Sequence, residues 1–297
     1  MLSRITATIA ERARNHKGST ASKQAWATVE ENLAKKAPFT PADKVLLKCR
    51  DGQSIEVSRM ALGTGSDGWM GNSNQTRTLG IDGLSDLLLH GFHEHGITCW
   101  DTADQYGSHA HVAKALKQVK REDVVVLTKT VATTADQMKR DIDRFRTELG
   151  TDYIDILLLH CMTHSDWPRR MQGVMDVISE ACEEGIIRMR GVSCHSFGAL
   201  KAAVTEPWVE LDLARINSGG KSMDATPDAV IAILEKMKAS SKSIMAMKVF
   251  GNGRLSGDLQ GCLQFALGLD FIDCMTIGCL SRKELDETAS LMRAIRA

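Results

Sequence analysis

The feature that most constrains this chain is a regular alternation of short apolar runs with amphipathic helical segments from residue 59 onward. The apolar runs have the length of buried strands and cover 59–63, 97–101, 124–128, 154–159, 189–193, 211–216, 244–248 and 273–277. Helix-compatible segments lie near 76–95, 109–119, 135–149, 167–184, 197–205, 227–238, 257–269 and 282–295. Short strands that alternate with helices of this length indicate βαβ units and a parallel sheet.

The number of repeats favours a closed sheet. Eight strand–helix units in about 250 residues are typical of a (β/α)8 TIM barrel. A doubly wound open sheet is the competing arrangement, but no Gly-x-Gly-x-x-Gly motif follows the first strand candidates. We therefore predict an α/β protein whose residues 43–297 form a (β/α)8 barrel.

Residues 1–42 precede the repeating pattern and are predicted to be a helical N-terminal extension. The segment 22–36 is compatible with a helix, which Pro38 and Pro41 would end. Residues 4–17 are amphipathic and contain arginine, so an organelle transit peptide is a minority interpretation, against which Glu11 argues weakly. Docking on the barrel, self-association and mobility are all open for this extension.

A β-hairpin is predicted between the extension and the barrel. Two strand-like runs, 45–48 and 55–57, flank an Arg50-Asp51-Gly52-Gln53 segment. An Asp-Gly pair between such runs is a strong hairpin signal because its backbone twist matches that of the strands.

Composition narrows the range of partners and compartments. The chain has 37 basic and 37 acidic residues, so its charge offers no argument for binding nucleic acid or an anionic membrane. Its eight cysteines are scattered without a Cys-x-x-Cys pair, which favours reduced thiols and a cytoplasmic location. No apolar run approaches the length of a membrane span. We expect a small-molecule substrate, and the oligomeric state is left open.

Polar residues end most of the predicted strands. They are Asp101, Lys129, His160, Ser193, Asn217 and Lys248. In a TIM barrel the active site lies at the carboxyl ends of the strands. Agreement among several strand ends is therefore a stronger indication of a site than any one of these residues.

Three of these residues and a nearby phenol suggest proton donation. Lys129 lies one strand away from Asp101, which can neutralise a buried ammonium, and Tyr106 follows Asp101 in a glycine-containing loop. A neighbouring ammonium favours the phenolate, so we expect it to lower the pKa of Tyr106. His160 can position a substrate oxygen. An acid that faces a developing alkoxide suits hydride addition to a carbonyl, with the hydride supplied by a cofactor.

On these residues the chain resembles the aldo-keto reductase family. The matching segments are Leu62-Gly63-Thr64-Gly65, Asp101-Thr102-Ala103 with Tyr106-Gly107, Lys129, Asp152-Tyr153-Ile154-Asp155 leading to His160, Gly185-Ile186-Ile187-Arg188 and Gly191-Val192-Ser193. The resemblance covers about residues 45–295. It implies reduction of an aldehyde or ketone, or the reverse oxidation, with Tyr106 as general acid. Lys129 paired to Asp101 would tune the acid, and His160 would orient the carbonyl.

The resemblance also implies an extended nicotinamide cofactor, NADP by preference with NAD possible. The residues assigned to it are Gly65, Ser66, Ser193, Asn217, Lys248, Phe250, Gly251, Gly253 and Arg282. Four positions depart from the family pattern: Cys194 stands for an asparagine, Lys248 for a serine, and Cys279-Leu280 for Lys-Ser. The glycines of the 248–253 loop are explained equally well by a turn.

Trp69, Met70 and Trp167 are predicted walls of the substrate pocket, and no metal is expected. Two alternatives remain open. A metal-dependent hydrolase on the same barrel would draw on His109, His111, His160, Cys161, His164, Cys194 and His195. A catalytically silent nucleotide-binding relative is the other.

Overall fold

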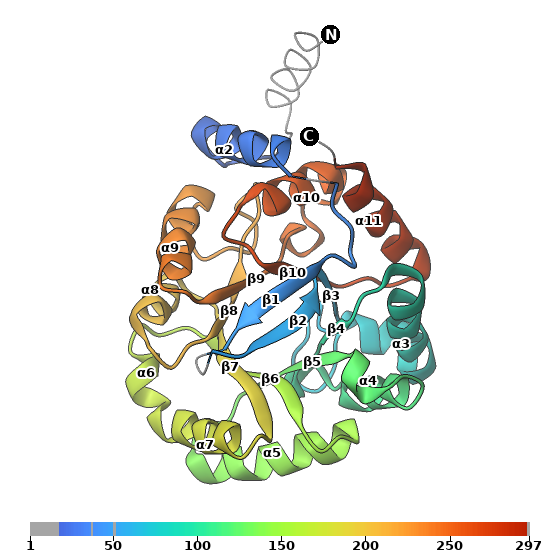
Figure 1. The fold of residues 1–297 in the computed structure, drawn as a ribbon, viewed down its shortest axis with the longest axis vertical. Helices are drawn as coiled ribbons and strands as arrows, with labels where there is room; N and C mark the ends of the chain where they lie inside the picture. Colours follow the sequence, from blue (N-terminus) through green and yellow to red (C-terminus); the bar gives the residue numbers. More distant parts are fainter. Residues whose placement is uncertain (1–17, 37, 50–51, 296–297) are drawn as a thin grey trace.

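The central element of the molecule is a closed barrel of parallel strands. The computed structural model describes residues 18–36, 38–49 and 52–295 (Figure 1). The barrel strands are β3 (Met60–Gly63), β4 (Cys99–Asp101), β5 (Val125–Thr130), β6 (Ile154–Met162), β7 (Ile187–Cys194), β8 (Leu211–Arg215), β9 (Ser243–Met247) and β10 (Cys274–Ile277). They pair in chain order, and β10 closes the ring by pairing with β3. The predicted (β/α)8 barrel is confirmed.

Helices surround the barrel (Figure 1). They are α3 (Asn74–His95), α4 (His109–Leu116), α5 (Ala135–Leu149), α6 (Trp167–Arg170), α7 (Gln172–Glu183), α8 (Phe197–Thr205), α9 (Pro227–Ala239), α10 (Leu259–Gly268) and α11 (Arg282–Ala294). Four short 3-10 turns complete the described elements: η1 (Asp104–Tyr106), η2 (Arg121–Asp123), η3 (Gly251–Gly253) and η4 (Ser256–Asp258). Within the described residues, no helix is long and apolar enough to cross a bilayer.

Two predicted helices are interrupted. The prediction of a single helix over 167–184 is wrong, because Met171 adopts φ −96° and ψ 6° and separates α6 from α7. Gly80 similarly leaves helical geometry inside α3, with φ 62° and ψ −174°. Apolar periodicity does not detect such breaks, since it reports which face is buried and not backbone dihedral angles.

Hydrophobic residues form two layers on either side of the strands. Along β6, Ile156 and Leu158 face the barrel interior, whereas Leu157 and Leu159 pack outward against the helices. Successive side chains of a strand point to opposite faces, so a strand buried on both faces reads as a continuous apolar run. That is why the strands are recognisable in the sequence.

The predicted hairpin closes one end of the barrel. It consists of β1 (Lys44–Lys48) and β2 (Ser54–Ser58), which pair antiparallel, and its 50–51 turn lies outside the described residues. Leu47, Ile55 and Val57 are buried and join the interior cluster of the barrel. The hairpin lies across the barrel in Figure 1, so the opposite end is the one that is free to bind a ligand.

The described part of the N-terminal extension packs against the barrel's outer helices. Helix α2 (Lys23–Ala34) contacts α10 through Trp26 and Phe265, whose ring centroids are 5.2 Å apart. The side-chain amide of Asn32 donates to the carbonyl of Gly268 at 2.8 Å. Residues 1–17, including the amphipathic segment, lie outside the described residues.

Candidate active site

A buried ion pair lies at the open end of the barrel. Lys129 of β5 donates to a carboxylate oxygen of Asp101, at the end of β4, and to the carbonyl of Thr102 at 2.9 Å. The hydroxyl of Thr276 donates to the second oxygen of Asp101 at 2.8 Å. Burial opposes the charge of Lys129, but Asp101 and Tyr106 outweigh it, and the pKa of Lys129 lies above its ordinary value. The ammonium is therefore fully charged at neutral pH.

The Tyr106 ring is held over this pair by two glycines. Tyr106 ends η1, and its ring centroid lies 4.8 Å from Lys129 Nζ. A Cβ atom at Gly65 would lie 2.0 Å from the Tyr106 ring, and one at Gly68 would lie 2.3 Å from it. Only glycine at both positions allows the backbone after β3 to approach the phenol so closely.

The expected lowering of the pKa of Tyr106 is wrong for this structure. Burial raises the pKa of the phenol, and the opposing charge of Lys129 reduces this effect without reversing it. The expectation rested on the neighbouring cation alone, whereas burial also removes the solvation that stabilises the charged phenolate. Tyr106 therefore holds its proton at neutral pH, as a proton donor must.

His160 faces the phenol from β6. Its Nε2 lies 3.4 Å from the hydroxyl oxygen of Tyr106, and the two rings meet edge to face. Burial, followed by the nearby charge of Lys129, holds the pKa of His160 well below its usual range. The imidazole is neutral, and its Nδ1 has no hydrogen-bond partner in the part of the chain that the structure describes.

A bulge near the end of β6 changes which side chains face the cavity. The pairing of β6 with β7 shifts between Leu159 and Met162, and Cys161 has a φ of 60°. Both His160 and Cys161 consequently line the cavity, although consecutive strand residues normally point to opposite faces. The predicted end of this strand at 159 is too early, because pairing continues to Met162.

The site opens into a cavity of about 730 Å³ at the carboxyl ends of the strands. Its walls include the loop after β3, the loop after β9 and the beginning of α11. The first two loops are linked: Lys248 donates to Asn252 Oδ1 at 2.9 Å, and the Asn252 amide donates to Asp67 Oδ1 at 2.5 Å. Sites for small molecules and cofactors commonly have volumes of about 300–1,000 Å³.

The structure divides the other predicted site residues into two groups. Those that line the cavity are Gly65, Ser66, Trp69, Lys248, Phe250 and Gly253. Those that are not among its lining residues are Met70, Trp167, Ser193, Asn217, Gly251 and Arg282.

Trp167 and Met70 require correction as pocket walls. Trp167 is buried in the helix-side core, and its indole N–H donates to the carbonyl of Ala199 at 3.2 Å. Met70 is 81% exposed and is not among the residues that line the cavity. Aromatic and sulfur side chains suit a pocket wall and a core equally well, so residue type alone did not separate the two roles.

The sequence pattern did not indicate two residues that shape the site: Gly68, which follows Gly65 by three residues, and Thr276, which lies near the end of the last strand. It indicated His195, which directly follows β7, only as a possible metal ligand. All three line the cavity. Reading every polar or glycine residue at the eight strand ends would have found them, whereas the β6 bulge at Cys161 has no local sequence signal.

Comparison with known proteins agrees with this geometry. The model of the aldo/keto reductase family matches residues 59–261. The chain belongs to the aldo/keto reductase family.

Individual relatives are distant. The aldo-keto reductase str7 of Strobilurus tenacellus is 27% identical over 215 residues, which are 69% of this chain and 62% of that protein. The NADH-specific methylglyoxal reductase of Escherichia coli is 28% identical over 166 residues, covering 47% of this chain and 49% of that protein. The chain thus spans less than two thirds of the length of these relatives.

Solved structures agree in fold. An aldo/keto reductase from Klebsiella pneumoniae in complex with NADP and acetate superposes with a TM-score of 0.61 at 21% identity. The superposition covers 84% of this chain and 90% of that one.

Proposed function

We propose that this protein reduces the carbonyl group of an aldehyde or ketone to an alcohol, or catalyses the reverse oxidation, with a nicotinamide dinucleotide. The observation that carries the proposal is the buried Asp101–Lys129 pair packed against the protonated phenol of Tyr106. A bound nicotinamide dinucleotide supplies the hydride to the carbonyl carbon. The residues of this chain supply the proton and the geometry.

Tyr106 is the proposed general acid. As negative charge develops on the carbonyl oxygen, the Tyr106 hydroxyl transfers its proton to that oxygen. The resulting phenolate is stabilised by Lys129, whose own charge is fixed by Asp101. The neutral imidazole of His160, 3.4 Å from the phenol oxygen, orients the carbonyl oxygen toward Tyr106.

The cavity offers groups suited to the cofactor. The ammonium of Lys248 and the backbone of Gly253 line its wall and can receive a pyrophosphate. Ser193 is fully buried and is not among the lining residues, but it lies on the same face of β7 as Met189, which faces the barrel interior. Its hydroxyl has no partner among the described residues. A carboxamide oxygen or nitrogen would satisfy it.

At the α11 wall, where the family resemblance places the adenosine end of the cofactor, we infer a preference for NADH over NADPH. Glu284 and Glu287 of α11 line that wall, whereas Arg282 and Lys283 are not among its lining residues. A carboxylate accepts a hydrogen bond from a ribose 2′-hydroxyl and repels a 2′-phosphate. The sequence pattern favoured NADP, and this wall is the reason that we reverse that preference. The names of the similar proteins do not decide the choice, because the Escherichia coli relative is NADH-specific and the Klebsiella pneumoniae structure holds NADP.

Oxidation of NADH in the presence of a panel of aldehydes and ketones tests the proposed activity. Tyr106→Phe should lower the turnover number by about 10²–10⁴-fold, the usual contribution of a general acid. Tyr153→Phe is the matched control, because Tyr153 is the chain's other tyrosine and packs against Arg121 instead. Full turnover by Tyr106→Phe would refute the assignment, and hydrolysis that depends on a metal would favour the alternative barrel enzyme.

Cofactor choice has its own test. Glu284→Gln removes the charge and keeps an acceptor for the Leu280 N–H, which Glu284 binds at 2.7 Å. Because the side chain is exposed, we expect the preference for NADH to fall by about two- to fivefold. Lys283→Gln should leave the ratio unchanged. A loss of NADPH binding in Lys283→Gln alone would instead indicate a 2′-phosphate contact.

A further inference from the structure

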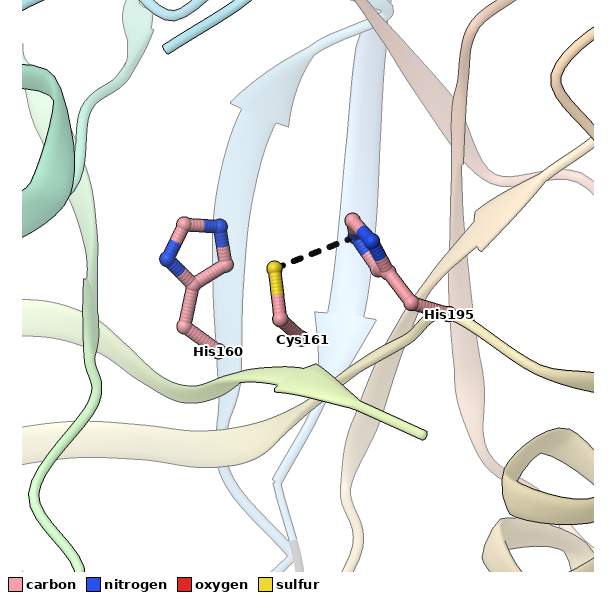
Figure 2. Close-up of side chains that lie close together, drawn as sticks. All are labelled: His160, Cys161 and His195. Atoms are coloured by element: carbon pink, nitrogen blue, oxygen red, sulfur yellow. Dashed lines mark hydrogen bonds between the residues drawn. The ribbon is translucent and has the colours of Figure 1, made fainter. Parts of the chain in front are cut away.

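Three metal-binding side chains meet on the floor of the cavity. His160, Cys161 and His195 each offer one ligand atom, and these atoms lie within 4.8 Å of one another (Figure 2). The Cys161 sulfur is 3.7 Å from His195 Nε2. In a tetrahedral zinc site with Zn–S near 2.3 Å and Zn–N near 2.1 Å, sulfur and nitrogen would be roughly 3.6 Å apart.

Backbone geometry brings these side chains together. The β6 bulge turns Cys161 to the same side as His160, at a φ of 60° that residues other than glycine seldom adopt. The next strand is fixed to the bulge, because the N–H of His195 donates to the carbonyl of Met162 at 2.8 Å. The three ligands therefore come from a rigid pair of strand ends and not from a mobile loop.

Hydrogen bonding leaves the cluster with capacity for a ligand. His160 is nearly fully buried, and its Nδ1 has no partner in the described part of the chain. The contact of Cys161 with His195 is the single hydrogen bond found for that thiol within the same residues. A buried imidazole nitrogen without a partner is costly unless a ligand or water completes it.

The surrounding charges do not prevent a cation from binding. The positive charges that act on the cluster are those of Lys129, Arg215 and Lys248. Lys129 is paired with Asp101, and Arg215 is paired with Asp224. Lys248 is linked through Asn252 to Asp67. Cys161 would release its proton on binding and add a negative charge to the site.

We propose that His160, Cys161 and His195 form a binding site for a borderline-soft dication such as Zn²⁺, with its fourth coordination position open to the cavity. One sulfur and two imidazole nitrogens suit Zn²⁺ and Co²⁺ better than Mg²⁺ or Ca²⁺, which require oxygen ligands. A bound ion uses a ring nitrogen of His160 as a ligand and fills the space in front of Tyr106. One consequence rests on the proposed function: Zn²⁺ blocks carbonyl reduction by this protein, and a chelator that removes the ion restores it.

Titration of the full chain with Co²⁺ tests the site without requiring turnover, because a cobalt–thiolate bond gives a charge-transfer absorption. We expect this absorption to saturate at one ion per chain. Cys161→Ser should abolish it, and His195→Ala should weaken binding by at least about tenfold. Cys182→Ser, a half-buried thiol of α7, is the matched control and should retain it.

A second group of potential ligands requires its own control. His90, His95 and Asp286 meet on the outside of the molecule and also lie within 4.8 Å of one another. They contain no sulfur, so cobalt bound there gives no thiolate absorption, and Asp286→Asn should leave the signal intact.

Absence of the absorption from the wild-type protein, or its persistence in Cys161→Ser, would overturn the proposal. If Cys161→Ser does not fold, as judged by circular dichroism, a His195→Ala variant whose cobalt affinity, read from the thiolate absorption, is undiminished would overturn it equally. A protein that binds cobalt but reduces no carbonyl would refute only the proposed function.

Discussion

Two sides of the barrel interior differ in how completely their polar groups are satisfied. On the β4–β5 side, Asp101 accepts from Lys129 and Thr276, and Lys129 also donates to the Thr102 carbonyl. On the β7–β8 side, the Ser193 hydroxyl, which faces the barrel interior, is buried without a partner among the described residues. The first side is complete before any ligand binds, whereas the second is not.

This difference separates two tasks. A general acid works best when its electrostatic surroundings are already in place, so that none of them must reorganise during the reaction. A binding surface instead gains affinity when a ligand satisfies groups that the protein leaves unpaired. The comparison therefore predicts that substitutions on the first side reduce catalysis and those on the second side change binding or stability.

The largest effect is expected at Lys129. Lys129→Met leaves the buried Asp101 carboxylate without its cation, which should lower the free energy of unfolding by about 3–5 kcal/mol and abolish carbonyl reduction. Denaturant unfolding and NADH oxidation measure the two effects. The double variant Asp101→Asn with Lys129→Met removes both charges, so it should recover most of the stability and none of the activity. Recovery of activity in the double variant would contradict the role of the ion pair.

Asp212 of β8, which faces the helices and not the barrel interior, should give the next largest effect, with a dependence on pH. Burial raises the pKa of Asp212 to about 7, against about 3.9 in an unfolded chain. The folded protein thus binds more protons between about pH 4 and pH 7, so stability contributed by this group is present below that range and is lost as pH rises through it. Asp212→Asn should be more stable than the wild type at pH 8, by roughly 4 kcal/mol, and similar to it at pH 4. Parallel stability profiles of the two proteins across this range would contradict the raised pKa.

A smaller effect is expected at Thr276. Thr276→Val removes one hydrogen bond to the Asp101 carboxylate, and such bonds to charged groups contribute about 1.5–3 kcal/mol. Turnover should fall because the carboxylate that holds Lys129 becomes less fixed, while the affinity for NADH should not change. Thermal unfolding measures the loss of stability, and steady-state kinetics measure turnover and the affinity for NADH separately. A change in NADH affinity without a change in turnover would assign Thr276 to the binding side instead.

Much of this structure could be predicted from the sequence, for identifiable reasons. Strands buried on both faces read as apolar runs, and each polar residue that ends a run, such as Asp101 or Lys129, falls at the same end of a parallel barrel. The β6 bulge could not be predicted, because it depends on pairing with β7 and leaves no mark near Cys161. The direction of the Tyr106 pKa shift was missed for a similar reason: burial by Gly65 and Gly68 is a contact between distant segments.

The most direct test of the difference between the two sides is a crossed measurement of NADH affinity and single-turnover hydride transfer. Tyr106→Phe should bind NADH as the wild type does and transfer hydride about 10²–10⁴-fold more slowly. Ser193→Ala should do the reverse, with affinity reduced by about two- to tenfold, the value of one hydrogen bond, and an unchanged hydride-transfer rate. If both variants alter the same constant, the division of the site into a preorganised acid and a ligand-completed binding surface is wrong.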